Sequence, residues 1–199
     1  MTRDGILRTV EGSLLVIGVV LGVWCAAVLI EARFHQTLPL TVTQTLPGDE
    51  SPGRAAAPTA GALLGRLEAP TVQMSTAVLE GSDDATLSRG AGHIEDTPLP
   101  GQAGNVGIAG HRDTVFRQLR HIKVGDPLEL ATSDRLYRYR IAKTAIVGPD
   151  DVDVLDPTGQ PTLTLVTCYP FEFVGHAPRR FVVQAVLVDE SARAATPAR

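Results

Sequence analysis

The stretch RLYRYRIAKTAIV at residues 135–147 alternates between two kinds of side chain. Tyr137 and Tyr139 fall on one side of an extended chain, and Arg138 and Arg140 fall on the other. Successive side chains of a strand point to opposite faces, so this pattern predicts a half-buried β-strand.

Shorter stretches on either side carry the same kind of signal and are separated by turns rich in Gly, Pro and Asp. Residues 84–89 and 113–122 are expected to form two short helices, the second capped by Asp113. Many strands without strand–helix alternation predict a mainly β domain that closes, or nearly closes, into a barrel. The further strands are expected at residues 69–74, 76–80, 105–109, 127–131, 162–168 and 180–188.

The composition limits the classes of protein to consider. The chain of 199 residues carries 18 Lys and Arg against 22 Asp and Glu, which gives a net charge of −4. This weakly acidic balance argues against a nucleic-acid-binding surface, which needs clustered basic residues. Hydrophobic residues make up 44% of the chain, which is enough for a packed core. The length suits one modest domain with appendages.

The uncharged run SLLVIGVVLGVWCAAVLI at residues 13–30 is long enough to cross the hydrocarbon core of a bilayer. Arg3 and Arg8 precede it, and this positive charge favours a cytoplasmic N-terminus. A cleaved signal peptide is the alternative, but residues 31–34 make a poor cleavage site. The sequence therefore predicts a retained, single-pass anchor in the cell membrane, with the rest of the chain extracytoplasmic.

The rest of the chain divides by composition. Residues 1–33 are expected to be the cytoplasmic N-terminus and the anchor. Residues 34–66 are rich in Pro, Ala and Gly and lack a hydrophobic period, which predicts a flexible linker. Residues 67–190 are expected to form the folded domain, and residues 191–199 a disordered tail.

The two cysteines have different surroundings. Cys25 lies in the membrane run, so Cys168 has no partner for a disulfide in the folded domain. A lone thiol of this kind is either a packing residue or a nucleophile. Cys168 stands where the expected strand 162–168 runs into Tyr169 and Pro170, and a strand end is a fixed, accessible position for a reactive side chain.

A reactive thiol needs a base or a cation nearby, because free cysteine has a pKa of about 8.5. His111 follows the expected strand 105–109, and Arg179 and Arg180 stand at the start of the last strand. An arginine can stabilise an oxyanion or hold a carbonyl group, although adjacent arginines are often only a solvated surface pair. The candidate catalytic residues are therefore Cys168, His111 and one of these two arginines.

Three motifs around these residues resemble those of the sortases, in particular the class D group. They are GHRDT at residues 110–114, TLVTCYPF at residues 164–171 and APRRFVV at residues 177–183. The resemblance extends over roughly residues 67–189, and the motifs occur in the family's order behind a hydrophobic N-terminal run.

The resemblance implies a cysteine transpeptidase on a closed sortase-type β-barrel of about eight strands. Cys168 would cleave an LPxTG- or LPxTA-like sorting signal after its Thr and form a thioacyl-enzyme. His111 would protonate the leaving amine and then deprotonate the incoming one. Arg180 rather than Arg179 would hold the substrate carbonyl and its oxyanion, because the family's arginine directly precedes the Phe-Val-Val strand and the two side chains alternate.

Three other residues have weaker claims to the site. The Thr167 hydroxyl could assist at the oxyanion, or Thr167 could be only a strand-forming residue. Asp113 could orient the His111 ring, but a helix cap is favoured. His93 could line the substrate groove, but a packed or surface histidine is favoured.

No metal or other cofactor is expected. His93, His111 and Cys168 lack the local spacing of zinc ligands. Some sortases use calcium, but the acidic cluster of this chain lacks the Asp-x-Asp-x-Asp-Gly pattern and is interpreted as solvated turn residues. That cluster consists of Asp150, Asp151, Asp153 and Asp156.

The partners implied are proteins with LPxTG- or LPxTA-like signals and an amine acceptor, such as a peptidoglycan precursor or a pilin lysine. The outcome would be surface-protein anchoring or pilus-type assembly. Residues 13–30 would bind the membrane, and no nucleic acid is expected. Two alternatives remain open: the same site could act mainly as a hydrolase, or the domain could be a non-catalytic, membrane-tethered peptide-binding module. A binding module would have a degraded His–Cys–Arg set, and here all three residues are intact.

Overall fold

The computed structural model describes Val19, residues 58–173 and residues 175–193. The chain divides into two units, Met1–Pro39 and Leu40–Arg199, and apart from Val19 every described residue belongs to the second. The expected membrane anchor except Val19, most of the expected linker and residues 194–199 lie outside the described residues. Among the residues that are described, no helix has the length and apolar character needed to cross a bilayer.

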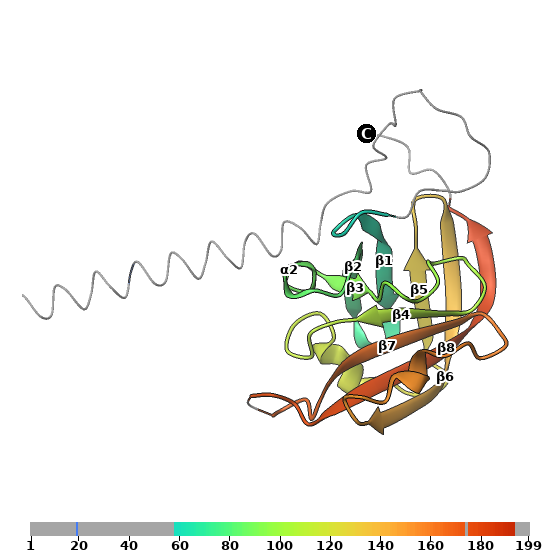
Figure 1. Cartoon of the computed structure of the whole chain (residues 1–199). Helices are drawn as coiled ribbons and strands as arrows, with labels where there is room; N and C mark the ends of the chain where they lie inside the picture. The colour runs from blue at the N-terminus through green and yellow to red at the C-terminus, as the bar shows by residue number, and fades with distance from the viewer. Residues whose placement is uncertain (1–18, 20–57, 174, 194–199) are drawn as a thin grey trace, which may run out of the picture. The chain divides into compact units, whose positions relative to one another are not determined.

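Eight strands form a closed barrel in the order β1-β2-β3-β4-β7-β8-β6-β5 (Figure 1). Antiparallel pairing of β1 with β5 closes it. The mainly β, closed barrel expected from the sequence is therefore confirmed. The strands are β1 Leu63–Ala69, β2 Met74–Glu80, β3 Ala91–His93, β4 Asn105–Ala109, β5 Pro127–Ala131, β6 Arg135–Val147, β7 Thr162–Tyr169 and β8 Arg179–Ala192.

The first strand differs from the prediction. It begins at Leu63, within the segment expected to be linker, and ends at Ala69, where the sequence was expected to start a strand. Pro70 follows and opens the 3-10 helix η1 Pro70–Val72, because proline has no backbone N–H to give to a strand ladder. At the other end, β8 runs to Ala192, two residues into the expected tail.

The helices whose bounds the structure gives are short. Asp83 caps α2 Asp84–Leu87 by accepting hydrogen bonds from the backbone N–H groups of Ala85 (2.9 Å) and Thr86 (3.1 Å). The helix expected at residues 113–122 is reduced to the 3-10 turn η2 Arg117–His121, and a further 3-10 turn, η3 Val152–Leu155, precedes β7.

The expected role of Asp113 as a helix cap is wrong. The residue before η2 is Phe116, and no side chain caps the turn. The carboxylate of Asp113 instead accepts a 3.3 Å hydrogen bond from Nε of Arg112 and remains 70% exposed. Phe116 is fully buried, and packing of this ring rather than a side-chain cap accompanies the turn.

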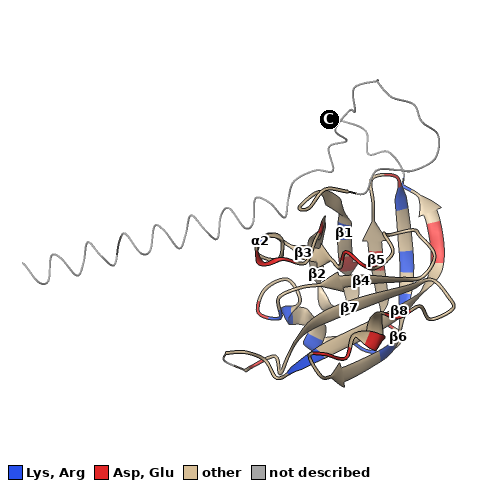
Figure 2. Cartoon of the chain, in the orientation of Figure 1, with Lys and Arg blue, Asp and Glu red and all other residues tan. Residues whose placement is uncertain are grey.

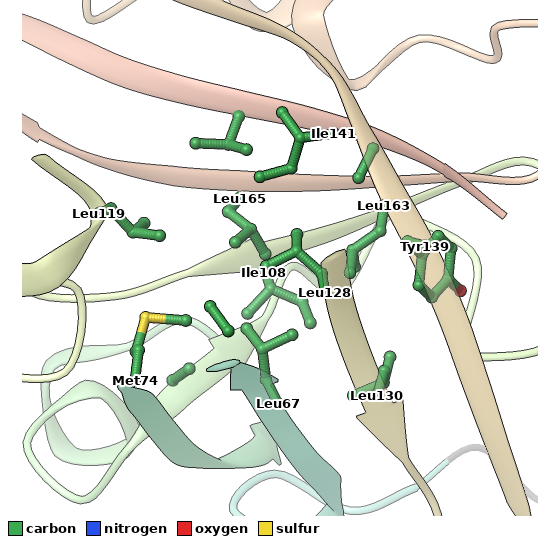
Figure 3. Close-up of a cluster of buried hydrophobic side chains, with 14 of the residues drawn as sticks. Leu67, Met74, Ile108, Leu119, Leu128, Leu130, Tyr139, Ile141, Leu163 and Leu165 are labelled. Atoms are coloured by element: carbon green, nitrogen blue, oxygen red, sulfur yellow. The ribbon is translucent and has the colours of Figure 1, made fainter. Parts of the chain in front are cut away.

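Aliphatic side chains from most of the strands meet inside the barrel (Figure 3). Leu67, Ile108, Leu128 and Leu165 are all fully buried. Burial of each such side chain contributes roughly 1.5–3 kcal/mol relative to exposure. Tyr139 joins this core, and burial raises the pKa of its hydroxyl above the ordinary value.

Charged residues occur along β6 and near the end of β8 (Figure 2). Arg138 contacts Asp189 and Glu129, and Arg135 pairs with Glu190. These pairs are exposed, so each contributes at most about 1 kcal/mol. They join neighbouring strands of the wall and lie apart from the lining of the site described next.

Candidate active site

Two parallel neighbours in the barrel, β4 and β7, end at the same edge. Their register pairs Ala109 with Val166. His111 follows β4 after one residue, and Cys168 is the last residue but one of β7. Since parallel strands run in the same direction, this pairing brings both side chains to one end of the barrel although 57 residues separate them in sequence (168 − 111).

Gly110 fixes the backbone just before His111. Its N–H donates to the carbonyl of Val166 at 3.1 Å, and its own carbonyl accepts from the Thr167 hydroxyl at 2.7 Å. A side chain at this position would have no room, because a Cβ atom would stand 2.6 Å from the Phe116 ring. The strand that carries Cys168 therefore also holds the turn that carries His111.

The hydroxyl of Thr167 is committed to this bond. The residue is 3% exposed, and its single O–H proton points to the Gly110 carbonyl. The expectation that the hydroxyl donates to a substrate oxyanion is therefore wrong. Thr167 acts on the site through the backbone of Gly110.

Cys168 and Arg180 are direct cross-strand partners on β7 and β8. Side chains opposite each other in an antiparallel pair share a face, with Cβ atoms about 5 Å apart. The neighbouring pair is Tyr169 with Arg179, which alternation turns to the opposite face. The register thus agrees with the choice of Arg180 over Arg179.

The Arg180 side chain is half-buried and already has partners in the loop before β8. Its Nη1 donates to the carbonyls of Ala177 (3.2 Å) and Arg179 (3.1 Å). A guanidinium has five N–H donors in a planar fork. The two bonds from Nη1 orient the group and leave further donors for a bound carbonyl.

These residues meet in one cavity of about 420 Å³. Cys168 is half-buried at its wall, while His111 is exposed. The cavity brings together the three candidate catalytic residues, and Asp113 as well. Its lining consists of His111, Arg112, Asp113, Cys168, Gly175, His176, Ala177 and Arg180.

His93 is not among the lining residues and lies inside the structure at 1% exposure. Its Nδ1 is 3.0 Å from a carboxylate oxygen of Glu80, and its Nε2 is 3.0 Å from the carbonyl of Pro98 and 3.1 Å from the Thr97 hydroxyl. His93 is therefore a packed residue with both ring nitrogens bonded, as favoured from the sequence, and a place in the groove is wrong.

Two further residues of the cavity received no role from the sequence. His176 is exposed. Arg112 stands in the GHRDT motif, but its burial at 7% exposure had no sequence signal beyond its place next to His111. Apart from Asp113, its partners are far away in sequence, so only the folded chain reveals them.

Acidic residues do not gather into a metal site among the residues that the structure describes: no group of three or more His, Cys, Asp or Glu side chains is arranged to hold an ion. The four aspartates considered for calcium are all exposed. Asp151 accepts a 2.7 Å hydrogen bond from the backbone N–H of Gly148, which closes a turn.

The sortase domain model matches residues 67–188, which is most of the barrel. The chain belongs to the sortase family. Sortase D of Bacillus subtilis is 39% identical over 127 residues, which cover 63% of this chain and 64% of that protein. Sortase SrtE1 of Streptomyces coelicolor is 31% identical over 201 residues, which cover 92% of this chain and 55% of that protein. The chain thus matches somewhat over half the length of these curated relatives.

Solved sortase structures share the barrel. A Clostridium perfringens Sortase D5 transpeptidase is 31% identical with a TM-score of 0.59, over 66% of this chain and 82% of that one. Sortase E1 of Streptomyces coelicolor, solved with a tripeptide in its active site, is 31% identical with a TM-score of 0.62, over 67% of this chain and 92% of that one. The family resemblance found in the three motifs is confirmed, and the Sortase D and Sortase D5 matches agree with its class D character.

Proposed function

We propose that this sortase-family chain is a cysteine transpeptidase in which Cys168 is the nucleophile, His111 the general acid and base, and Arg180 the oxyanion stabiliser. The observation that carries the proposal is the direct opposition of Cys168 and Arg180 in a cavity that also contains His111. A nucleophile, a proton carrier and a permanent cation in one place are the groups that acyl transfer requires.

In the first half of the reaction, the Cys168 thiolate attacks the carbonyl carbon of the substrate Thr. Arg180 donates hydrogen bonds to the oxygen, which becomes negative as the tetrahedral intermediate forms. The C–N bond then breaks, and His111 gives a proton to the leaving amine. The product is a thioester between Cys168 and the peptide.

In the second half, an amine enters beside His111 and attacks the thioester carbonyl. His111 takes the proton that the amine loses, the C–S bond breaks, and a new amide and the Cys168 thiolate result. Since the proton returns to His111 and the thiolate is restored, the cycle needs no metal, redox partner or other cofactor.

The substrates proposed are proteins with an LPxTG- or LPxTA-like signal, and the acceptor is an amine such as a peptidoglycan precursor or a pilin lysine. Support comes from the class D-like motifs and from the sortases that the chain matches. We place the chain in the cell membrane, single-pass with the N-terminus inside, on the strength of the run at residues 13–30.

The test uses the full chain in detergent micelles, mixed with LPxTG and LPxTA peptides, with intact mass as the readout. An adduct equal to the acyl LPxT fragment is expected on the wild-type chain and not on Cys168→Ala. Adduct formation followed by water-only release would favour a hydrolase. If the folded chain forms no adduct and cleaves no peptide, the transpeptidase proposal is wrong and a peptide-binding module is left.

A further inference from the structure

Arg112 is a buried cation beside the proposed acid and base. It follows His111 directly and is only 7% exposed. A charged group is seldom buried without partners, because it loses its hydration. The partners of Arg112 therefore indicate what this residue holds in place.

Most of these partners lie in the loop between β7 and β8, here residues 170–173 and 175–178. Nη1 of Arg112 donates to the carbonyl of Pro170 at 2.8 Å. Nη2 donates to the carbonyl of Phe173 and, at 3.4 Å, to that of Gly175. One planar guanidinium thus binds three successive points of the β7–β8 loop, a geometry that the fork of arginine permits and a lysine ammonium does not.

The same loop forms one wall of the cavity. Gly175, His176 and Ala177 line it on this side, and His111 and Asp113 line it from the turn after β4. Arg112 belongs to that turn by sequence and to the loop by its hydrogen bonds. Its side chain therefore links the loop wall to the wall that carries His111.

The proposed chemistry gives a reason for holding these two walls of the cavity together. His111 serves both the leaving amine and the incoming amine, so both must occupy the part of the cavity next to His111. The wall that Arg112 holds is thus part of the boundary of this amine side, the part of the cavity that the leaving and incoming amines occupy. Water is small and needs no such boundary, whereas an amine acceptor must be oriented.

We propose that Arg112 is a positioning residue that, by holding the β7–β8 loop against the turn of His111, makes the thioacyl-enzyme react with an amine rather than with water. The inference rests on the transpeptidase function proposed above. Arg112 contacts loop carbonyls, and it acts by fixing the shape of the part of the cavity that the amines occupy.

The test measures how the acyl-enzyme divides between two fates. The full chain in micelles is acylated by an LPxTG or LPxTA peptide, and triglycine or Nα-acetyl-lysine amide is added as the acceptor. The ratio of aminolysis to hydrolysis products is read by mass spectrometry. Because each acylated molecule must take one of the two routes, this ratio is insensitive to the amount of folded enzyme.

For Arg112→Ala we expect the ratio to fall about tenfold, the effect of losing one charge-assisted hydrogen bond, with a higher acceptor concentration needed for half-saturation. Arg112→Lys keeps the charge without the planar fork, and its ratio should lie between those of the wild type and Arg112→Ala. If the alanine variant does not fold, the lysine variant provides the test. The matched control is Arg120→Ala, because Arg120 also reaches the loop, through a 3.6 Å ion pair with the exposed Glu172. This control should retain the wild-type ratio.

A wild-type ratio in both Arg112 variants, even at low total turnover, would overturn the inference and leave the transpeptidase function standing. An equal fall in Arg120→Ala would also overturn it, since any contact with the loop would then suffice. A wild-type chain that forms no acyl adduct would overturn the transpeptidase proposal and this inference together.

Discussion

The side chain of Thr167 donates a 2.7 Å hydrogen bond to the backbone carbonyl of Gly110. Each of these residues stands directly before a proposed catalytic residue, Thr167 before Cys168 and Gly110 before His111. A second bond, from the Gly110 N–H to Val166, lies next to the first. The distance between nucleophile and base is therefore set by the backbones that precede them.

Replacing Thr167 by Val should separate these two backbones without opening a large cavity. The Gly110 carbonyl loses its donor in a buried place, so we expect about 1–3 kcal/mol less stability in urea unfolding. A misplaced His111 should lower kcat/KM for the sorting-signal peptide about tenfold or more. Thr167→Ser keeps the hydroxyl and should retain most of the activity; equal losses in Ser and Val variants would contradict the role given to this bond.

Arg180→Ala and Arg179→Ala form a matched pair of adjacent substitutions. Because Arg180 lies opposite Cys168, its loss should lower kcat about 100- to 1,000-fold, the usual effect of removing an oxyanion donor. Arg179 lies opposite Tyr169 and should change kcat by no more than about twofold. Acylation rates from quenched-flow mass spectrometry measure both, with circular dichroism as the check on folding. Similar losses from the two variants would refute the assignment.

His93→Ala should act on stability and spare the chemistry. It leaves the largely buried Glu80 carboxylate without its hydrogen-bond partner, for which we expect a cost of about 1–3 kcal/mol in the free energy of unfolding. Activity per folded molecule should stay near that of the wild type, since His93 does not line the cavity. The control is His121→Ala, an exposed histidine. A rise in KM for the peptide with unchanged stability would contradict this prediction and indicate that His93 lines the substrate groove.

Asp83 gives the α2 cap a dependence on pH. The hydrogen bond from the Thr86 hydroxyl, with those from backbone N–H groups, lowers the pKa of this carboxyl below its usual 3.8. A lowered pKa in the folded state means that the stabilisation is complete above about pH 4 and is lost as the pH falls through the folded value.

Asp83→Asn still accepts hydrogen bonds but has no charge to lose. The difference in melting temperature between wild type and Asp83→Asn should therefore be constant near neutral pH and shrink below about pH 4. A difference that grows on acidification would show that the cap does not stabilise the ionised form.

Sequence patterns located several strands of the barrel correctly and missed others. β5 and much of β6 lie where alternation placed them, because one face of each is in the core and strand periodicity records burial; β4 is buried along most of its length and was located as an apolar run. β3 has only three residues, too few for any period to appear. β1 was misplaced because Pro70 and its neighbours are apolar without being extended.

For the site, the sequence supplied the residues but not their connections. A cross-strand register such as Cys168 with Arg180 depends on which strands become neighbours, and motifs only suggested it. Apart from the Asp113 carboxylate next to Arg112, the partners of Thr167 and Arg112 are backbone carbonyls more than fifty positions away along the chain. Backbone groups are the same at every residue, so no pattern of side chains could have indicated these bonds.

The place of β8 in the barrel has a consequence for how the enzyme comes into being. It is the last strand described, yet it is hydrogen-bonded between β6 and β7 rather than at an edge. A protein chain is synthesised from its N-terminus onward, so His111 and Cys168 are made before β8, the strand that pairs with β7 and supplies Arg180. Protein synthesis must therefore reach β8 before Arg180 can lie beside the Cys168 thiol. A chain that ended before Arg179 would have the proposed nucleophile but not the proposed oxyanion stabiliser.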